Sequence, residues 1–412
     1  MCTYLQRNRR GQKVNVAILG FGTVGSGIYE ILKERREHIA KKTGEEINVR
    51  YILDVRDFSS HPDAHLFVND INVILEDKSV DVVCEVIGGV EPSLTFSKEA
   101  LKRGKSVVTS NKELVAKHGT SLMALAKENG AIYLFEAAVG GGIPLIRPIY
   151  RCLAGNKITK IMGILNGTTN YILTKMFDEG QSFEAALSDA QAKGYAERNP
   201  AADVEGHDTC RKIAILSSLV YGKNINSDLI ETEGITNIDA EDVKYAEMLG
   251  GVIKLVGYSE IGDKNVYARV SPMLLSNENP LSCAKDVFNA ALITGDSVGD
   301  VMLYGRGAGK LPTASAVVGD IIDICMNKNA FMSWEEGAEC DVDVSGERKC
   351  GLFVRVADAD AQCFEEKYKG ATKISGVKEN ECAFIIPSIS IKEAKEISAV
   401  KKIYTEENYV IL

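Results

Sequence analysis

The stretch that most constrains the fold is GFGTVG, residues 20–25. An apolar run rich in β-branched residues, VNVAIL, leads into it, and a helical pattern, SGIYEILKERREHIA, follows it. Strand, glycine turn and helix in this order are typical of a dinucleotide site, because the turn exposes amides at a helix start. The sequence therefore predicts a nucleotide-binding turn, with a glycine turn that binds nothing as the alternative. The predicted contacts are Gly20, Phe21, Gly22, Thr23, Val24 and Gly25.

More strands and helices alternate after this turn. Apolar runs occur at INVRYILDV, VDVVCEVIG, SVVTSN and AIYLFEAAV, with helix-like segments such as PSLTFSKEALKRG and LMALAKENG between them. Such alternation implies a parallel sheet covered on both faces. We expect an α/β fold with a Rossmann-type, doubly wound parallel sheet over residues 1–143.

The second predicted strand ends in ILDVRD, where charged residues bear on the choice of cofactor. A carboxylate at this place favours the ribose hydroxyl of NAD, and an arginine favours the extra phosphate of NADP. Asp54 or Asp57 competes with Arg56 here, and we favour NADP through Arg56. Charges that only decorate a strand end are the alternative.

The pattern changes at about residue 144. A strand entering a helix (KITKIMGILNGTTNYILTKMFDEG) and an apolar helix (HDTCRKIAILSSLVYG) precede two strand-rich segments and the helical LPTASAVVGDIIDICM. They predict a second domain, of α+β type, over residues 144–325. Residues 326–349 are expected to form an acidic connector, with a return to the first domain left open. Residues 350–412 fit a small βαββαβ module.

Composition excludes several classes of protein. A net charge of -9 argues against a general nucleic-acid binder, because such proteins carry a basic excess. The ten cysteines form no CxxC pair and no cluster with histidine, which indicates unpaired thiols in a reducing cytosol and no zinc site. No apolar run has the length of a signal peptide or a membrane span. We expect a soluble cytoplasmic protein.

Several long motifs now carry a resemblance. In chain order they are GFGTVG, EVIGG (85–89), SNK (110–112), EAAVGGGIP (136–144), NGTTNYIL (166–173), GYAERNPAADVEGHD (194–208) and YGRGAGKLPTASAVVGD (304–320). Together, over residues 14–325, they resemble homoserine dehydrogenase. The resemblance implies NAD(P)H-dependent reduction of L-aspartate 4-semialdehyde to L-homoserine, on the route to threonine, methionine and isoleucine. The alternatives are an oxidoreductase for another amino-acid semialdehyde and a catalytically silent dinucleotide-binding regulator.

Two lysines are the catalytic candidates. Hydride delivery to an aldehyde leaves negative charge on oxygen, so an acid nearby lowers the barrier. Lys212 fits this role by resemblance, and Asp208 lies four residues before it, on the same helix face. Lys112 follows a strand at its carboxyl end, where open α/β sheets bind ligands. The resemblance places Lys112 near both nicotinamide and substrate and Ser110 at the cofactor, and a surface lysine is the alternative for Lys112. An ordinary surface ion pair is the alternative for Lys212 and Asp208.

The substrate carries an ammonium and a carboxylate, so the pocket needs charges of both signs. Glu197 resembles the family's ligand for homoserine, Asp203 supports it, and Asp208 can also touch the substrate hydroxyl. Glu205 is expected to be solvated.

Glycine-rich segments suggest two further sites. EAAVGGGIP exposes main-chain oxygens, which are ligands for hard cations. The resemblance implies a structural monovalent cation, typically sodium, and a glycine hinge is the alternative. Its ligands would be the main-chain oxygens of Glu136, Val139, Gly141 and Ile143. By resemblance Gly194 and Gly309 approach the nucleotide, although tight turns explain them as well. Thr168 and Thr169 are expected to cap a helix, with a role in the pocket wall as the alternative.

The C-terminal module resembles the ACT module of long forms of this enzyme. The expected Pro-Gly-Val-Leu turn after its first strand is replaced by DADAQCFEE. We therefore expect a degenerate ACT-like module that serves packing or dimerisation rather than threonine binding. A homodimer or a dimer of dimers is expected, since most soluble oligomers are symmetric.

Overall fold

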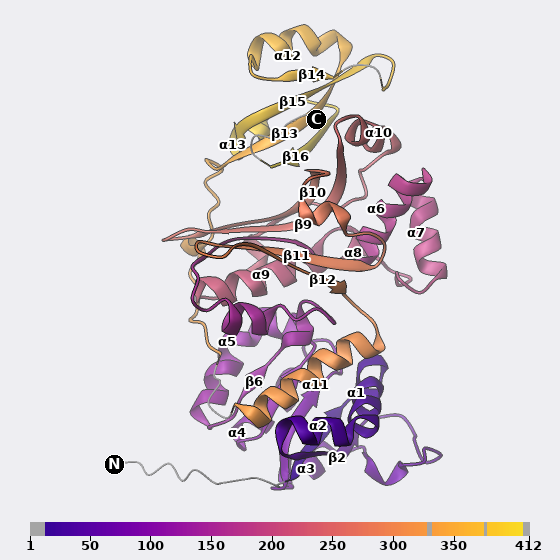
Figure 1. Cartoon of the computed structure of the whole chain (residues 1–412), viewed down its shortest axis with the longest axis vertical. Coiled ribbons are helices and arrows are strands. Elements are labelled where there is room, and N and C mark those ends of the chain that lie inside the picture. The colour runs from indigo at the N-terminus through magenta and orange to yellow at the C-terminus, as the bar shows by residue number, and fades with distance from the viewer. Residues whose placement is uncertain (1–12, 328–331, 375–376, 407–412) are drawn as a thin grey trace. The chain divides into compact units, whose positions relative to one another are not determined.

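The computed structural model describes residues 13–327, 332–374 and 377–406 (Figure 1). Its contacts divide the chain into two compact units. Unit 1 comprises Met1–Cys152, Gly222–Asn224 and Arg306–Glu336, and unit 2 comprises Leu153–Tyr221, Ile225–Gly305 and Gly337–Leu412.

Unit 1 is built on a six-stranded sheet. Its strands are β1 (Lys13–Leu19), β2 (Glu46–Leu53), β3 (Phe67–Val68), β4 (Val80–Glu85), β5 (Ser106–Thr109) and β6 (Tyr133–Leu134). All neighbours pair in parallel in the order β3-β2-β1-β4-β5-β6. This is the order of dinucleotide-binding folds, and it confirms the predicted Rossmann-type sheet. Strand β6 is shorter than AIYLFEAAV suggests, because the chain turns into a short 3-10 segment at Glu136–Ala138.

Helices flank this sheet. They are α1 (Thr23–Glu34), α2 (Arg36–Thr43), α3 (Ile71–Glu76), α4 (Ser93–Lys102), α5 (Lys112–Glu128) and α11 (Lys310–Met326). The sequence groups residues 310–325 with the second domain, whereas α11 packs on α1 in unit 1. A Cβ on Gly27 would lie only 2.9 Å from the Ala314 Cβ, and Lys310 pairs with Glu30 at 2.6 Å. The chain thus returns to unit 1 at α11, because α11 packs on a helix that is far from it in the sequence.

Unit 2 contains a mixed sheet. Its strands are β7 (Ile158–Ile164), β8 (Glu231–Thr232), β9 (Gly251–Ile261), β10 (Val266–Ser276), β11 (Phe288–Gly295), β12 (Gly299–Arg306), β13 (Lys349–Ala357), β14 (Thr372–Ile374), β15 (Glu381–Ser390) and β16 (Lys401–Thr405). They follow the order β12-β11-β7-β9-β10-β16-β13-β15-β14, and β8 pairs with β10.

The helices of unit 2 position the site. They are α6 (Gly167–Glu179), α7 (Phe183–Ala192), α8 (Ala201–Val204), α9 (His207–Tyr221), α10 (Ala240–Met248), α12 (Ala361–Lys367) and α13 (Ile391–Glu396). Helix α9 packs closely on β9. A Cβ on Gly257 would lie only 3.0 Å from the Thr209 side chain. The Ser217 hydroxyl also donates to Ser259 at 2.7 Å. One face of β9 and β10 is therefore covered by α9.

The C-terminal segment folds in the expected order β13-α12-β14-β15-α13-β16, and Figure 1 shows it in yellow beside β10. Strand β16 pairs in parallel with β10, so one sheet runs through both parts of unit 2. Arg355, only 1% exposed, is paired with Asp239 and Asp242 of the α10 region and with Glu381. The boundaries expected at residues 326, 349 and 350 stay predictions.

Across the described ranges, no helix joins the length and the apolar character that crossing a bilayer would require. Within the same ranges, His, Cys, Asp and Glu side chains form no cluster of three or more suited to a metal ion.

Candidate functional site

The glycine turn after β1 has the geometry that its sequence predicts. Gly20 has a positive φ of 96°, which favours glycine. A Cβ on Gly25 would lie 1.9 Å from the Gly20 carbonyl oxygen, so only glycine lets α1 approach this closely. A Cβ on Gly22, by contrast, would have no neighbour within 4 Å among the described atoms. Gly22 therefore leaves an open approach at the N-terminal end of α1, which fits a pyrophosphate.

The end of β2 contacts this turn through Asp54. The Asp54 carboxylate accepts a hydrogen bond of 2.7 Å from the Phe21 amide. It also accepts from the Arg56 side chain, through Nε and Nη2, both at 2.9 Å. Hydrogen bonding from Arg56 holds the pKa of Asp54 well below its usual range. The carboxylate is buried and the guanidinium is 58% exposed, so the arginine can reach a ligand from solvent. Asp57 instead accepts from the Ser59 amide.

Buried polar contacts join the ends of β4 and β5. The Glu85 carboxylate, fully buried, accepts from the Ile87 amide at 2.9 Å and from the Thr109 hydroxyl at 2.7 Å. Asn111 caps α5 and donates to the Gly89 carbonyl at 2.6 Å. Ser110 and Lys112 flank this asparagine, and both are partly buried. The motifs EVIGG and SNK thus meet at the carboxyl edge of the sheet that also carries the glycine turn.

The predicted cation loop is tightly packed. The Glu136 carboxylate accepts from three successive amides, those of Leu145, Ile146 and Arg147, at 2.5, 2.7 and 2.8 Å. Burial nevertheless raises the pKa of Glu136. Gly141 has a φ of 59°, and a Cβ on it would lie 2.0 Å from the Gly307 oxygen. With the carboxylate occupied by amides, a cation in this loop would have to use main-chain oxygens.

In unit 2, Lys212 and Asp208 form a buried ion pair rather than a surface one. The Lys212 Nζ lies 2.8 Å from the Asp208 carboxylate and donates to the Leu165 carbonyl at 2.6 Å. The side chains are only 10% and 5% exposed. An ammonium with a carboxylate in contact is favoured in its charged form. The arrangement presents an amine that is fixed in position beside a carboxylate.

Asn166 links the acidic residues and was missed by the sequence analysis. Its amide nitrogen donates to Asp203 at 2.7 Å and to Asp208 at 2.9 Å. Its oxygen accepts from the Thr169 amide at 2.8 Å, which makes it the N-cap of α6. The expectation that Thr168 and Thr169 cap this helix is therefore wrong. An asparagine three residues before Thr169 was the signal that could have identified the cap.

Thr168 and Thr169 have other partners. The Thr168 hydroxyl donates to the Tyr195 carbonyl at 2.7 Å, and the Thr169 hydroxyl donates to Asn166 oxygens. Thr168 thereby ties the start of α6 to the segment that follows α7.

Three predicted residues lie outside this cluster. The Glu197 side chain is exposed and makes no hydrogen bond to the part of the chain that the structure describes, although its carbonyl accepts from Gln191. Gly194 follows α7 with a φ of 74°, and Gly309 precedes α11 in unit 1 with a φ of 122°. Turn conformation accounts for both glycines, so their nucleotide contacts stay predictions. Glu205 is exposed and lies 3.2 Å from His207, as expected of a solvated side chain.

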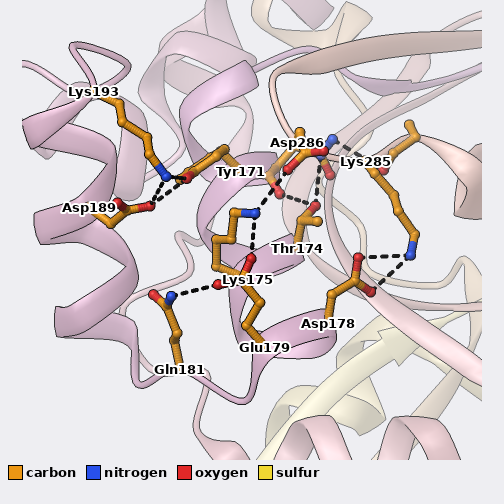
Figure 2. A network of polar contacts seen from close by, with 12 residues as sticks. Tyr171, Thr174, Lys175, Asp178, Glu179, Gln181, Asp189, Lys193, Lys285 and Asp286 are labelled. Atoms are coloured by element: carbon orange, nitrogen blue, oxygen red, sulfur yellow. Dashed lines mark hydrogen bonds and ion pairs between the residues drawn. The ribbon is translucent and has the colours of Figure 1, made fainter.

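Helix α6 is anchored along its length by polar contacts (Figure 2). Tyr171 and Lys193 both bond to Asp189 of α7. On the side facing the loop after Pro280, Asp178 pairs with Lys285 at 2.9 Å (Figure 2). These contacts fix the helix whose N-cap holds the two aspartates.

Comparisons with known proteins agree with these features. Residues 20–136 match the family model described as homoserine dehydrogenase, NAD binding domain, and residues 144–322 match the model described as homoserine dehydrogenase. The chain is 40% identical over 318 residues to homoserine dehydrogenase from Bacillus subtilis, which covers 76% of this chain and 73% of the relative. It is 42% identical over 314 residues to the Neisseria gonorrhoeae enzyme, with 76% and 72% covered.

Solved structures extend the likeness to the whole fold. A homoserine dehydrogenase from Thiobacillus denitrificans is 31% identical with a TM-score of 0.87, over 97% of this chain and 99% of that one. A hyperthermophilic archaeal homoserine dehydrogenase in complex with NADPH is 33% identical with a TM-score of 0.67, over 78% and 99%. With both family models matched in order and these identities over most of the length, the chain belongs to the homoserine dehydrogenase family, whose members are oxidoreductases.

Proposed function

We propose that the chain catalyses the reversible, NAD(P)H-dependent reduction of L-aspartate 4-semialdehyde to L-homoserine, in the biosynthesis of threonine, methionine and isoleucine. The observation that carries this proposal is the buried Lys212–Asp208 pair held by Asn166. It supplies a fixed, charged amine, which is what an oxygen that gains negative charge needs.

The residues of the glycine turn fit the cofactor. The open approach at Gly22 and the start of α1 would hold the pyrophosphate, with Gly20, Phe21, Thr23, Val24 and Gly25 around it. When bound, the dinucleotide supplies the hydride. Ser110 and Lys112 at the same sheet edge would contact it, and Lys112 adds positive charge there.

Lys212 performs the proton transfer in this proposal. Its Nζ donates a proton to the aldehyde oxygen as charge develops, and it takes the proton back in the reverse direction. Asp208 holds the amine in place and can accept from the substrate hydroxyl. Because the amine also donates to the Leu165 carbonyl, its direction is set from two sides.

The substrate's amino-acid end requires charges as well. We assign Glu197 to the substrate ammonium, and its exposed carboxylate is open to a ligand from solvent. Asp203 supports the same end, because Asn166 fixes its carboxylate beside that of Asp208. Lys112 is a candidate partner for the negative charge of the substrate.

For the cofactor we propose NADP, with NAD accepted. The exposed Arg56 guanidinium is placed to meet a 2′-phosphate, and Asp54 would repel that phosphate unless Arg56 stays close. The archaeal relative was solved with NADPH. We also propose a structural sodium ion on the main-chain oxygens of Glu136, Val139, Gly141 and Ile143.

Assembly and location are proposed on general grounds. A symmetric homodimer, or a dimer of dimers, fits the prevalence of such assemblies. The degenerate ACT-like module would serve packing or dimerisation. A reducing, cytoplasmic location fits a structure in which no two of the described cysteines form a disulfide.

The direct test mixes purified protein with L-aspartate 4-semialdehyde and either NADPH or NADH, and follows cofactor absorbance. Oxidation of the cofactor supports the proposal, and no oxidation with either one contradicts it. Tight cofactor binding without turnover would favour the silent regulator. A panel of other amino-acid semialdehydes tests the other alternative, an oxidoreductase that acts on a different semialdehyde.

A further inference from the structure

One cavity in unit 2 has no part in the reaction proposed above. Its volume is about 270 Å³, which is room for a small molecule. It lies where β7, β9 and β10 meet the start of β13 and the end of β16 in the C-terminal module. The lining side chains include Lys160, Tyr258, Glu260, Tyr267, Arg269, Met273, Arg348, Lys349, Tyr404 and Glu406.

Strand register places the floor of this cavity on one sheet face. Tyr258 is paired with Arg269, and Glu260 is paired with both Tyr267 and Lys160. Residues that pair across strands share a face, and so do residues two apart along a strand. Helix α9 packs on Gly257 and Ser259, which point to the opposite face. The cavity therefore lies on the face of β9 and β10 that α9 does not cover.

Arg269 is the unusual residue in the cavity. It is 6% exposed, and its Nε and Nη1 are buried without a well-formed hydrogen bond among the described residues, although the Tyr267 and Tyr404 side chains lie close to the guanidinium. The nearest carboxylates, those of Glu231 and Glu233, stay at 3.6 Å. Its guanidinium carbon lies 3.5 Å from the centre of the Tyr404 ring. A buried guanidinium with unmet donors is costly, and a ligand with acceptor oxygens would satisfy it.

A second arginine stands at the rim. The Arg348 side chain is 27% exposed, pairs with Glu260 and lies over the Tyr267 ring at 5.3 Å. Counting Lys160 and Lys349, four cationic side chains line the cavity against two carboxylates, those of Glu260 and Glu406, while Glu231 and Glu233, which pair with Arg269, are outside the lining. The lining thus favours an anion, while the tyrosines and Met273 offer apolar surface.

We propose that this cavity binds a small molecule through its carboxylate, with Arg269 as the main anchor and Arg348 as the second. The planar guanidinium fork matches the two oxygens of a carboxylate. Dicarboxylates and α-amino acids share this chemistry. The DADAQCFEE turn follows Ala357 at the far end of β13, whereas Lys349 and Cys350 at its near end line the cavity.

Contacts within unit 2 connect the cavity to the candidate active site. Arg269 pairs with Glu231 of β8 and with Glu233. The Ile235 amide, two residues further, donates to the Val204 carbonyl at 2.8 Å. A Cβ on Gly206 would lie 3.1 Å from Thr232 of β8. Val204 and Gly206 lie between Asp203 and Asp208, two of the proposed substrate-binding residues. A ligand that draws Arg269 away from the two glutamates therefore shifts the segment that carries these aspartates.

Calorimetric titration of the full chain with succinate and with L-alanine tests the binding. Succinate is expected to bind wild type, and Arg348→Ala and Arg269→Lys are each expected to weaken binding at least tenfold. Because Arg269→Lys keeps the charge but loses the fork, it separates bidentate recognition from simple attraction. Lys373→Ala, which removes an exposed lysine elsewhere in the module, is the control and should bind as wild type does.

The titrations show which class of ligand binds, and they can also overturn the proposal. Binding of succinate alone identifies a dicarboxylate, and binding of L-alanine as well identifies an amino acid as a second source. No binding of either probe, or equal binding by the Arg348→Ala variant, overturns the site. Arg348→Ala keeps the proposal testable if the buried Arg269 variant does not fold.

A kinetic readout tests the coupling and rests on the proposed function, whereas the titration does not. Saturating succinate is expected to change the KM for homoserine by about threefold or more in wild type and not in Arg348→Ala, with kcat little changed. An equal change in both proteins would overturn the coupling and leave the binding result standing.

Discussion

Two buried amines lie at different places along α6 and have opposite surroundings. Lys212, at the N-cap end, is 8% exposed and touches the Asp208 carboxylate at 2.8 Å. Lys254 of β9, beside Asn170, is 4% exposed. Its Nζ donates to the Asn170 side-chain oxygen at 2.9 Å and to the Ala284 carbonyl at 2.6 Å, and both acceptors are neutral.

The two amines are buried to a similar degree and differ in their partners, since Lys212 contacts a carboxylate and Lys254 only neutral oxygens. Burial without an adjoining carboxylate lowers the pKa of Lys254 to about 8, and Lys285 nearby adds to this. Lys212 is almost as buried, but it has the Asp208 carboxylate as a counter-charge at 2.8 Å. We therefore assign proton transfer to Lys212, and to Lys254 the structural task of tying β9 to α6 and the loop at Ala284.

The largest expected effect is on turnover. Lys212→Ala should lower kcat by a factor on the order of 10² to 10⁴, the usual contribution of a positioned acid or base. Lys254→Met, which removes an equally buried amine, should leave kcat within about threefold. Steady-state assays with homoserine and NADP measure both. Similar losses in the two variants would mean that burial of any amine matters, and the comparison would fail.

The second effect is on stability at the Lys212–Asp208 pair. Asp208→Asn keeps the shape but leaves a buried cation without its counter-charge, so unfolding free energy should fall by about 3 kcal/mol. Glu205→Gln, an exposed carboxylate three residues earlier, is the matched control and should change it by less than about 0.5 kcal/mol. Urea denaturation measures both. Equal values for the two variants would contradict a buried, charged pair.

The third effect depends on pH. Between pH 8 and 10.5 the unfolded chain binds more protons at Lys254 than the folded chain does, so this residue makes stability rise with pH across that window. The term amounts to a few kcal/mol, on the order of 3. Comparing wild type with Lys254→Met by denaturation at pH 7.5 and pH 10 isolates it. A difference that does not change with pH would show that Lys254 is not destabilised by burial.

The smallest effect concerns two asparagines, Asn166 at the N-cap of α6 and Asn170 within the helix. Asn166→Ala removes the helix cap and costs about 1 kcal/mol, and it should also raise the KM for homoserine, because Asp203 and Asp208 lose a shared donor. Asn170→Ala removes an acceptor of Lys254 and should lower stability alone. Thermal denaturation and substrate titration of both variants test this. An unchanged KM in Asn166→Ala would show that Asn166 does not position the substrate-binding carboxylates.

Local patterns made much of the first unit predictable. The turn at residues 20–25 follows steric rules that act within a few residues, and alternation of strands and helices implies the parallel sheet. The order of strands in the C-terminal module was predicted in the same way. Lys212 and Asp208 were found through a motif and their spacing.

Features that depend on distant contacts were not predictable. The return of α11 to unit 1 requires Gly27 and Ala314 to meet, although 287 positions separate them in the numbering. The burial of the Lys212 pair depends on the sheet under α9, so sequence alone left a surface ion pair open. Asn166 was overlooked because two threonines beside it are also good capping residues. Lys254 lies in an apolar strand and has no motif.

Single-turnover kinetics can separate the roles of Lys212 and Lys254 in hydride transfer. Wild type, Lys212→Ala and Lys254→Met, each preloaded with NADPH, are mixed with L-aspartate 4-semialdehyde, and the loss of NADPH absorbance is followed. We expect NADPH to bind all three proteins with dissociation constants within about threefold, and hydride transfer to slow by a factor on the order of 10² or more only in Lys212→Ala. Hydride transfer in Lys212→Ala within tenfold of wild type would contradict the account.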